Sequence, residues 1–363
     1  MKRIIFFCGV TLLAVVLSVR AAERAILVSL DGVRCQEMFQ GLDPEVWQAQ
    51  NEGKDIKTTD LYQKFWAETP EERRLKLMPF FWGVLMKEHG AIVGNRFNGS
   101  VMKLTNRHRF SYPGYSEMLT GQANDAVIKS NDKIQNPTPT VLDFLRDELK
   151  LPRERVAAFA SWDVFNWIVT SRAGSLVANS GFQAYEHPDP EIRKLSDLQF
   201  HTPTPWNSVR HDIYTFRFAM AHLKTHRPPV LYLALGETDD WAHDKRYDRV
   251  LEALHRNDAY FRELWEWLEA QEDYRGKTTL LFATDHGRGD YSLNWMHHND
   301  KLEGAAYVWL AAAGAGVKPR GELKTTGELG QNQVAATLAR ALGRDYRTAQ
   351  PGAGPAVQLF FQP

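Results

Sequence analysis

The 363-residue sequence shows no excess of charge of either sign. Its 44 basic and 44 acidic residues give a formal net charge of zero, and no basic run stands out. Proteins that bind nucleic acid nonspecifically use such runs to neutralise phosphates, so we expect no nucleic-acid scaffold as a partner. Internal repeats and low-complexity tracts are lacking as well. With 44% hydrophobic residues the chain can bury a full core. A small soluble substrate fits the composition better than nucleic acid does.

Cysteine is scarce, with Cys8 and Cys35 as the two in the sequence. Cys8 follows Phe7 and lacks the small residues that a lipoprotein signal needs. If an N-terminal segment that contains Cys8 is removed, Cys35 is the one cysteine left, and no disulfide within the chain can form. Stability then depends on the core and on bound metal.

The N-terminal segment has the order of a secretory signal peptide. Lys2 and Arg3 precede an apolar run over residues 4–19, and small residues follow near Ala21. The run is short for a membrane span. We therefore predict a signal peptide over residues 1–22 and a periplasmic or secreted protein with no stable membrane anchor after cleavage. An uncleaved anchor is the alternative.

Apolar runs of strand length alternate with helical patterns along the rest of the chain. This alternation predicts βαβ units, with a mostly parallel sheet between helices on both faces. We expect a three-layer α/β/α sandwich in a single domain over residues 23–363, with small insertions near 42–75 and 185–210. The predicted strands are 25–30, 91–94, 156–160, 230–235, 280–283 and 306–311, and the predicted helices are 76–88, 140–149, 206–222, 247–270, 333–342 and one that ends at Gly121.

Three of these predicted strands end in acidic residues. Asp31 follows the first, Asp239 and His243 follow the strand at 230–235, and Asp285 with His286 follow the strand at 280–283. In open α/β sheets, ligands bind at the carboxyl ends of the strands. The spacing of Asp239 and His243 also puts both side chains on one face of a helical turn. The sequence therefore predicts metal ligands gathered at one edge of the sheet.

Two further imidazoles, His297 and His298, follow Trp295 downstream of the same strand. Each acidic motif has a plainer explanation. Asp31 before a glycine is typical of a turn, and acidic residues after a strand can complement the positive end of a helix. Asp240 and Asp244 form a competing pair without an imidazole.

A hydroxyl group is placed where it could act as a nucleophile. Ser111 lies just before Pro113 and an apolar segment that predicts a helix ending at Gly121. Helix N-termini bind anions such as phosphoryl groups, and a metal ion can activate a serine hydroxyl placed there. The alternative is that Ser111 is merely an N-cap.

Four motifs in order resemble the alkaline phosphatase superfamily, and within it the type I phosphodiesterase/nucleotide pyrophosphatase-like branch. They are VSLDG at 28–32, FSYPGYSEMLTG at 110–121, DDWAH at 239–243, and TDHG at 284–287 followed by WMHH at 295–298. Each is weak alone, but the set covers nearly the whole chain after residue 22. The resemblance implies the alkaline phosphatase-like fold and a hydrolase of phosphoric esters that works through a covalent phosphoserine.

The resemblance also implies the roles of the residues. It assigns two divalent ions, zinc or alternatively manganese, and a phosphoserine at Ser111, with Asn131 as a donor to phosphate and Asn136 as a second candidate. His298 is preferred to His297 because the family tends to show Trp-x-x-His, counted from Trp295. One metal would be held by Asp239, His243 and His298, and the other by Asp31, Asp285 and His286 with the Ser111 oxygen.

Two alternatives stay open. Sulfatases of this superfamily carry arginine at the position of Tyr115, so a sulfatase-like sulfuric ester hydrolase fits less well. A catalytically silent metal-binding relative would be expected to lack a ligand, and all six are present.

Between monoesters and diesters the sequence decides little. The stretch 161–163 lacks the Lys-x-Arg pair of some monoesterase relatives.

Overall fold

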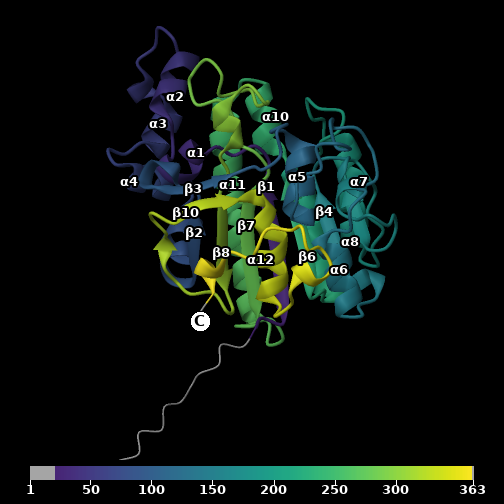
Figure 1. Ribbon diagram of the computed structural model, residues 1–363. Helices are drawn as coiled ribbons and strands as arrows, with labels where there is room; N and C mark the ends of the chain where they lie inside the picture. The colour runs from purple at the N-terminus through teal and green to yellow at the C-terminus, as the bar shows by residue number, and fades with distance from the viewer. Residues whose placement is uncertain (1–20, 362–363) are drawn as a thin grey trace, which may run out of the picture.

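The computed structural model describes residues 21–361. The predicted signal peptide over residues 1–22 therefore lies outside the described part of the chain, apart from its last two residues. The described chain builds a central sheet with helices packed on both sides (Figure 1).

The central sheet has the strand order β5-β4-β6-β1-β7-β8-β2-β9. Its strands are parallel, except that β8 runs antiparallel to both β7 and β2. A second sheet pairs β3 with β10. The strands are β1 Arg24–Leu30, β2 Gly90–Val93, β3 Ser100–Lys103, β4 Val156–Ala160, β5 Val177–Ser180, β6 Val230–Leu235, β7 Thr278–Thr284, β8 Leu310–Gly314, β9 Gly321–Glu322 and β10 Gly327–Gly330.

Two hydrophobic cores lie on opposite faces of this sheet. Side chains alternate along a strand, so Ile26 and Val28 of β1 belong to one core while Ala25 and Leu27 belong to the other. Helices α1, α9 and α11 pack in the first core, and α5, α6, α7 and α12 in the second. The predicted three-layer α/β/α sandwich is thus confirmed.

The α-helices of the described chain have the following bounds: α1 Cys35–Gln40, α2 Pro44–Gln50, α3 Asp60–Phe65, α4 Pro70–Leu77, α5 Ser111–Thr120, α6 Val141–Glu148, α7 Phe165–Ile168, α8 Pro190–Leu198, α9 Asp212–His226, α10 Glu237–His243, α11 Tyr247–Ala270 and α12 Val334–Ala341.

Three predicted elements differ from the observed ones by more than two residues at an end. The helix expected at 76–88 is divided, because Pro79 has no N–H with which to continue α4, and a π-helix follows over Phe81–His89. The helix expected from 206 begins at Asp212, since residues 208–210 bond the backbone of residues 161–163. The strand expected at 306–311 is β8, which starts at Leu310, because Tyr307 and Val308 pair with β3 instead.

The two expected insertions contain helices of their own. Residues 42–75 hold α2, α3 and most of α4, and residues 185–210 hold α8. The first of these segments lies against the turn that follows α10, where the Gln50 amide donates to the Lys245 carbonyl and accepts from the Tyr247 N–H.

Candidate active site

The central strands β6, β1 and β7 end level with one another. Leu30 at the end of β1 pairs with Leu235 of β6 and with Thr284 of β7. The residues that follow each strand therefore meet at one edge of the sheet, where α10 lies (Figure 1). This register brings together Asp31, Asp239 and the Asp285-His286 pair, although they are far apart in the sequence.

Asp31, Asp285 and His286 form a compact group that we call the second cluster. The His286 Nε2 atom lies 3.4 Å from Asp31 Oδ1 and 3.4 Å from Asp285 Oδ2. It also lies 3.3 Å from Ser111 Oγ. Ligand atoms held at zinc-like bond lengths around a tetrahedral ion stand about 3.3 Å apart. The three distances from His286 Nε2 fit one such ion.

The two oxygens that face His286 in the second cluster lack hydrogen-bond partners. Asp31 Oδ1 and Asp285 Oδ2 are both buried and unpartnered. Their companion oxygens are held, since Tyr115 OH donates to Asp31 Oδ2 (3.0 Å) and the Gly32 N–H donates to Asp285 Oδ1 (3.0 Å). Buried polar atoms are nearly always satisfied, so two orphaned carboxylate oxygens beside one imidazole fit a cation.

His286 is prepared as a ligand. Its Nδ1 atom donates to the Gly287 carbonyl at 2.9 Å, which leaves the lone pair on Nε2. Burial lowers the pKa of His286 to about 4, so the ring is neutral at physiological pH. A neutral imidazole with a fixed tautomer is the form that binds metal.

Asp239, His243 and His298 form the adjacent group, the first cluster. His243 Nε2 lies 3.1 Å from Asp239 Oδ2 and 2.9 Å from His298 Nε2. The His298 ring stacks on His286 with centroids 4.0 Å apart, which joins the two clusters. A carboxylate oxygen and both Nε2 atoms could share a second ion.

The described side chains around Asp239 can also be grouped in another way. Asp239, His286 and His298 offer ligand atoms that all lie within 4.8 Å of one another. His297 is exposed, whereas the His298 side chain is 9% exposed and faces the carboxylates. His243 is 43% exposed, so the clusters open to solvent on its side.

The charge of the carboxylates is only partly offset within the protein. Burial, followed by repulsion from Asp285 and Asp239, raises the pKa of Asp31 well above its ordinary value. Burial and repulsion from Asp239 do the same to Asp285. For Asp239, burial is outweighed by Arg288 and the neighbouring histidines, which hold its pKa well below the usual range. Divalent cations would remove the remaining repulsion.

Ser111 is the first residue of α5, and a tight turn delivers it to the second cluster. Arg109 has a positive φ of 56°, and the buried Glu117 carboxylate accepts from the N–H groups of Thr105 and Asn106, which holds the turn against the helix. Gly114 allows the close approach, since a Cβ there would lie 2.3 Å from the Asp285 carbonyl oxygen.

The two candidate asparagines differ in their surroundings. Asn131 Oδ1 accepts from the Tyr112 N–H at 3.0 Å, at the N-terminus of α5 next to Ser111. Its Nδ2 has no hydrogen-bond partner among residues 21–361, so it is free to donate. Asn136 is buried, its Nδ2 donates to the Ile168 carbonyl and its Oδ1 accepts from the Thr138 N–H, so its amide is engaged within the fold.

The sequence analysis did not find the residues that support the clusters. Asp212 Oδ1 accepts from the Gly236 N–H at 2.8 Å and so holds the start of α10. Arg288 contacts Asp239, and Tyr115 bonds Asp31. Tyr115 lies inside a quoted motif and Arg288 directly follows one, but hydrogen-bond partners so distant in sequence leave no local signal.

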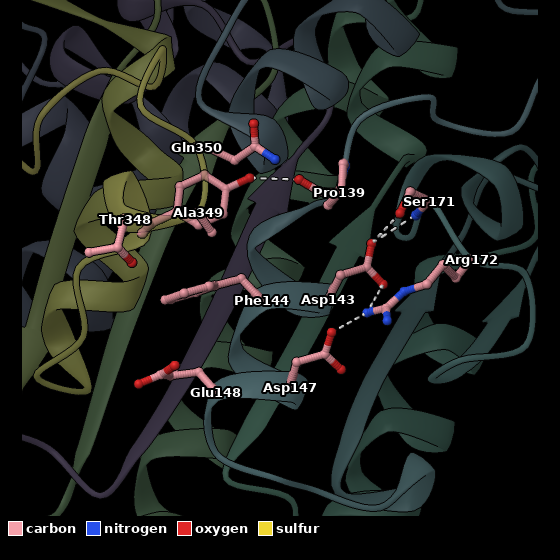
Figure 2. Close-up of a pocket in the computed structure, with 11 residues that line it drawn as sticks. Pro139, Asp143, Phe144, Asp147, Glu148, Ser171, Arg172, Thr348, Ala349 and Gln350 are labelled. Atoms are coloured by element: carbon pink, nitrogen blue, oxygen red, sulfur yellow. Dashed lines mark hydrogen bonds and ion pairs between the residues drawn. The ribbon is translucent and has the colours of Figure 1, made fainter.

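A separate cavity of about 540 Å³ lies between α6 and residues 346–350 (Figure 2). None of its lining residues belongs to either cluster. Its most buried acid, Asp143, already accepts from Thr170 and Ser171 and lies 3.6 Å from Arg172. Nothing about this cavity points to the chemistry of the two clusters.

Comparison with solved structures defines the class of fold. The alkaline phosphatase PafA superposes with a TM-score of 0.60 at 9% identity, covering 95% of this chain and 100% of that one. The lipoteichoic acid synthase LtaP from Listeria monocytogenes gives 0.54 at 11% identity, with 90% and 73% covered. The 2-O GAG sulfatase BT1596 gives 0.51 at 11% identity, with 90% and 71% covered. The fold is alkaline phosphatase-like.

The sequence matches the type I phosphodiesterase / nucleotide pyrophosphatase family over residues 36–357. The chain belongs to this family, as the motifs predicted. Membership supports a hydrolase that acts on phosphoesters. No curated protein matches the sequence. Within residues 21–361, no helix has the length and apolar character needed to cross a membrane.

Proposed function

We propose that this protein is an exported two-metal phosphoric ester hydrolase that works through a phosphoserine at Ser111. The observation that carries the proposal is the position of the Ser111 oxygen. It lies 3.3 Å from His286 Nε2, where it could serve as the fourth ligand of an ion in the second cluster. Ser111 is 5% exposed and begins α5, so a phosphoryl group on its oxygen would lie at the positive end of the helix.

The residues present fit two ions. Asp31, Asp285, His286 and the Ser111 oxygen would hold one, and Asp239, His243 and His298 the other. Mixed carboxylate and imidazole ligands favour zinc, with manganese as the alternative. When bound, two such ions lower the pKa of a coordinated hydroxyl and offset the charge on the attacking and leaving oxygens.

The protein's own residues would act in two displacements. Ser111 Oγ gives up its proton to solvent and forms a bond to phosphorus while the ester P–O bond breaks, and the leaving oxygen takes up a proton from solvent to depart as the alcohol. Water then attacks the phosphoserine, which restores the Ser111 hydroxyl and releases phosphate. The free Nδ2 of Asn131 would donate to an oxygen of the phosphoryl group, and the helix N-terminus would favour its negative charge.

The substrate would be a small phosphate ester. The opening beside His243 gives a leaving group access to the first cluster. Tyr115 stands where sulfatases carry arginine, and its hydroxyl bonds Asp31, which favours phosphate over sulfate esters. We also propose that residues 1–22 direct export to the periplasm or the medium and that residues 23–363 act as a single catalytic domain.

The test compares wild type with Ser111→Ala and His243→Ala after loading with Zn²⁺ or Mn²⁺. The substrates are p-nitrophenyl phosphate, bis-p-nitrophenyl phosphate, a nucleotide and a sulfate ester. Wild type should hydrolyse at least one phosphate ester, and both variants should lose nearly all of that turnover. Ser116→Ala is the matched control, because Ser116 lies buried in the same helix and its hydroxyl has no partner.

Near wild-type turnover by Ser111→Ala on every phosphate ester would rule out the covalent mechanism. Turnover confined to the sulfate ester would favour the sulfatase-like alternative. A well-folded wild type that binds both ions but hydrolyses none of the four esters would favour the silent relative.

A further inference from the structure

Arg288 is a buried cation beside the first cluster that the proposed mechanism leaves without a role. It follows the Asp285-His286-Gly287 motif and is 2% exposed. Its guanidinium group lies against Gly32, where a Cβ atom would come within 2.9 Å of Arg288 Nε. Burying a guanidinium costs free energy unless its surroundings compensate, so its partners indicate what it does.

The partners of Arg288 belong to two separate segments that carry ligands. Nη2 donates to the Asp239 backbone carbonyl at 2.9 Å and also contacts the Asp239 Oδ1 atom. Nη1 donates to the Met296 carbonyl at 2.6 Å, two residues before His298. One side chain therefore fastens α10 to the loop that carries His298.

The contact also orients the Asp239 carboxylate. Arg288 engages Oδ1, while Oδ2 remains 3.1 Å from His243 Nε2. Ligating carboxylates commonly have their second oxygen held by a hydrogen bond in this way, and such partners tune metal affinity. A planar guanidinium can reach both Asp239 and the Met296 carbonyl, which a single ammonium group cannot do in the same geometry.

We propose that Arg288 is a positioning residue that sets Asp239 and the His298 loop in place for the metal ion of the first cluster. This inference rests on the proposed function, because it assumes that an ion binds there. Arg288 would have little influence on the second cluster, whose Asp31, Asp285 and Ser111 atoms it does not bond.

The role of Arg288 can be tested on the full chain by metal binding alone, without an activity assay. Competition with a chelator gives the Zn²⁺ affinity, and Co²⁺ absorption gives the number of ions bound. We expect wild type to bind two ions. Arg288→Met should bind one of them about 10–100-fold more weakly and the other as wild type does. Arg288→Lys should also bind this ion more weakly, because an ammonium group keeps the charge but cannot reach both Asp239 and the Met296 carbonyl. Arg288→Gln gives the same test if the methionine variant does not fold.

Arg210→Met is the matched control. Arg210 is another buried arginine, but it bonds Asn179 and Thr215, away from both clusters, so its loss should leave both affinities unchanged. The role of Arg288 is rejected if Arg288→Met binds both ions as wild type does or more tightly, if lysine restores full affinity, or if Arg210→Met shows the same loss. A wild type that binds no ion rejects the proposed function itself.

Discussion

The close contact between α5 and the end of β7 leads to a sharp prediction for Gly114→Ala. The added methyl group would lie 2.3 Å from the Asp285 carbonyl oxygen, where an ordinary contact is 3.4 Å or more. The start of α5 must therefore move away by about 1 Å. Overpacking costs about 1–3 kcal/mol, and alanine recovers up to about 1 kcal/mol of helix propensity. The variant should fold with a net loss of about 0–3 kcal/mol.

Activity should suffer far more than stability. Ser111 lies one helical turn before Gly114 and would be carried away from His286, and a displacement of about 1 Å in a reacting group can cost on the order of 100-fold in rate. The measurement is kcat on the best phosphate ester, together with the melting temperature.

Gly83→Ala is a matched control for Gly114→Ala. Gly83 is also helical, but its Cβ would meet only the Leu75 side chain, at 3.3 Å. This control should keep both its activity and its fold. Wild-type kcat in Gly114→Ala would refute the claim that the close approach places the nucleophile.

Three further predictions concern metal binding and stability. Tyr115→Phe removes the donor to Asp31 and should weaken Zn²⁺ binding about 10-fold and lower stability by about 1 kcal/mol, as calorimetry and urea unfolding would show. His222 is buried and neutral, and burial lowers its pKa from 6.5 to about 4. Stability should therefore fall by about 3 kcal/mol between pH 6.5 and 4 as the unfolded chain takes up the proton, and His222→Gln should lack this component in urea titrations. Chelation of the metals should lower the free energy of unfolding, by about 2.7 kcal/mol for each site if the free metal had been at 100 times the Kd of that site.

The fold was largely predictable because its strands carry strong local signals. The strand at 230–235, the strand at 156–160 and the helix at 247–270 have the predicted bounds. Strand β5 was missed because Val177–Ser180 ends in polar residues and gives no apolar run. The break at Pro79 could have been read from the sequence, since proline cannot continue a helix.

The sequence allowed the residues of the candidate site to be predicted, but not the contacts that these residues make. Strand ends rich in acids and imidazoles showed which residues would meet, because parallel strands share one edge. The sequence could not show that the Asp31 and Asp285 oxygens facing His286 would be left without partners. Nor could it show that Arg288 would cross from the end of β7 to Asp239, since that contact depends on the packed sheet.

Anomalous diffraction from crystals of the zinc-loaded protein tests the central claim most directly. The account predicts two metal peaks, one among Asp239, His243 and His298, and one among Asp31, Asp285 and His286 within bonding distance of Ser111 Oγ. A structure with well-ordered side chains at both clusters and no metal beside Ser111 would contradict it.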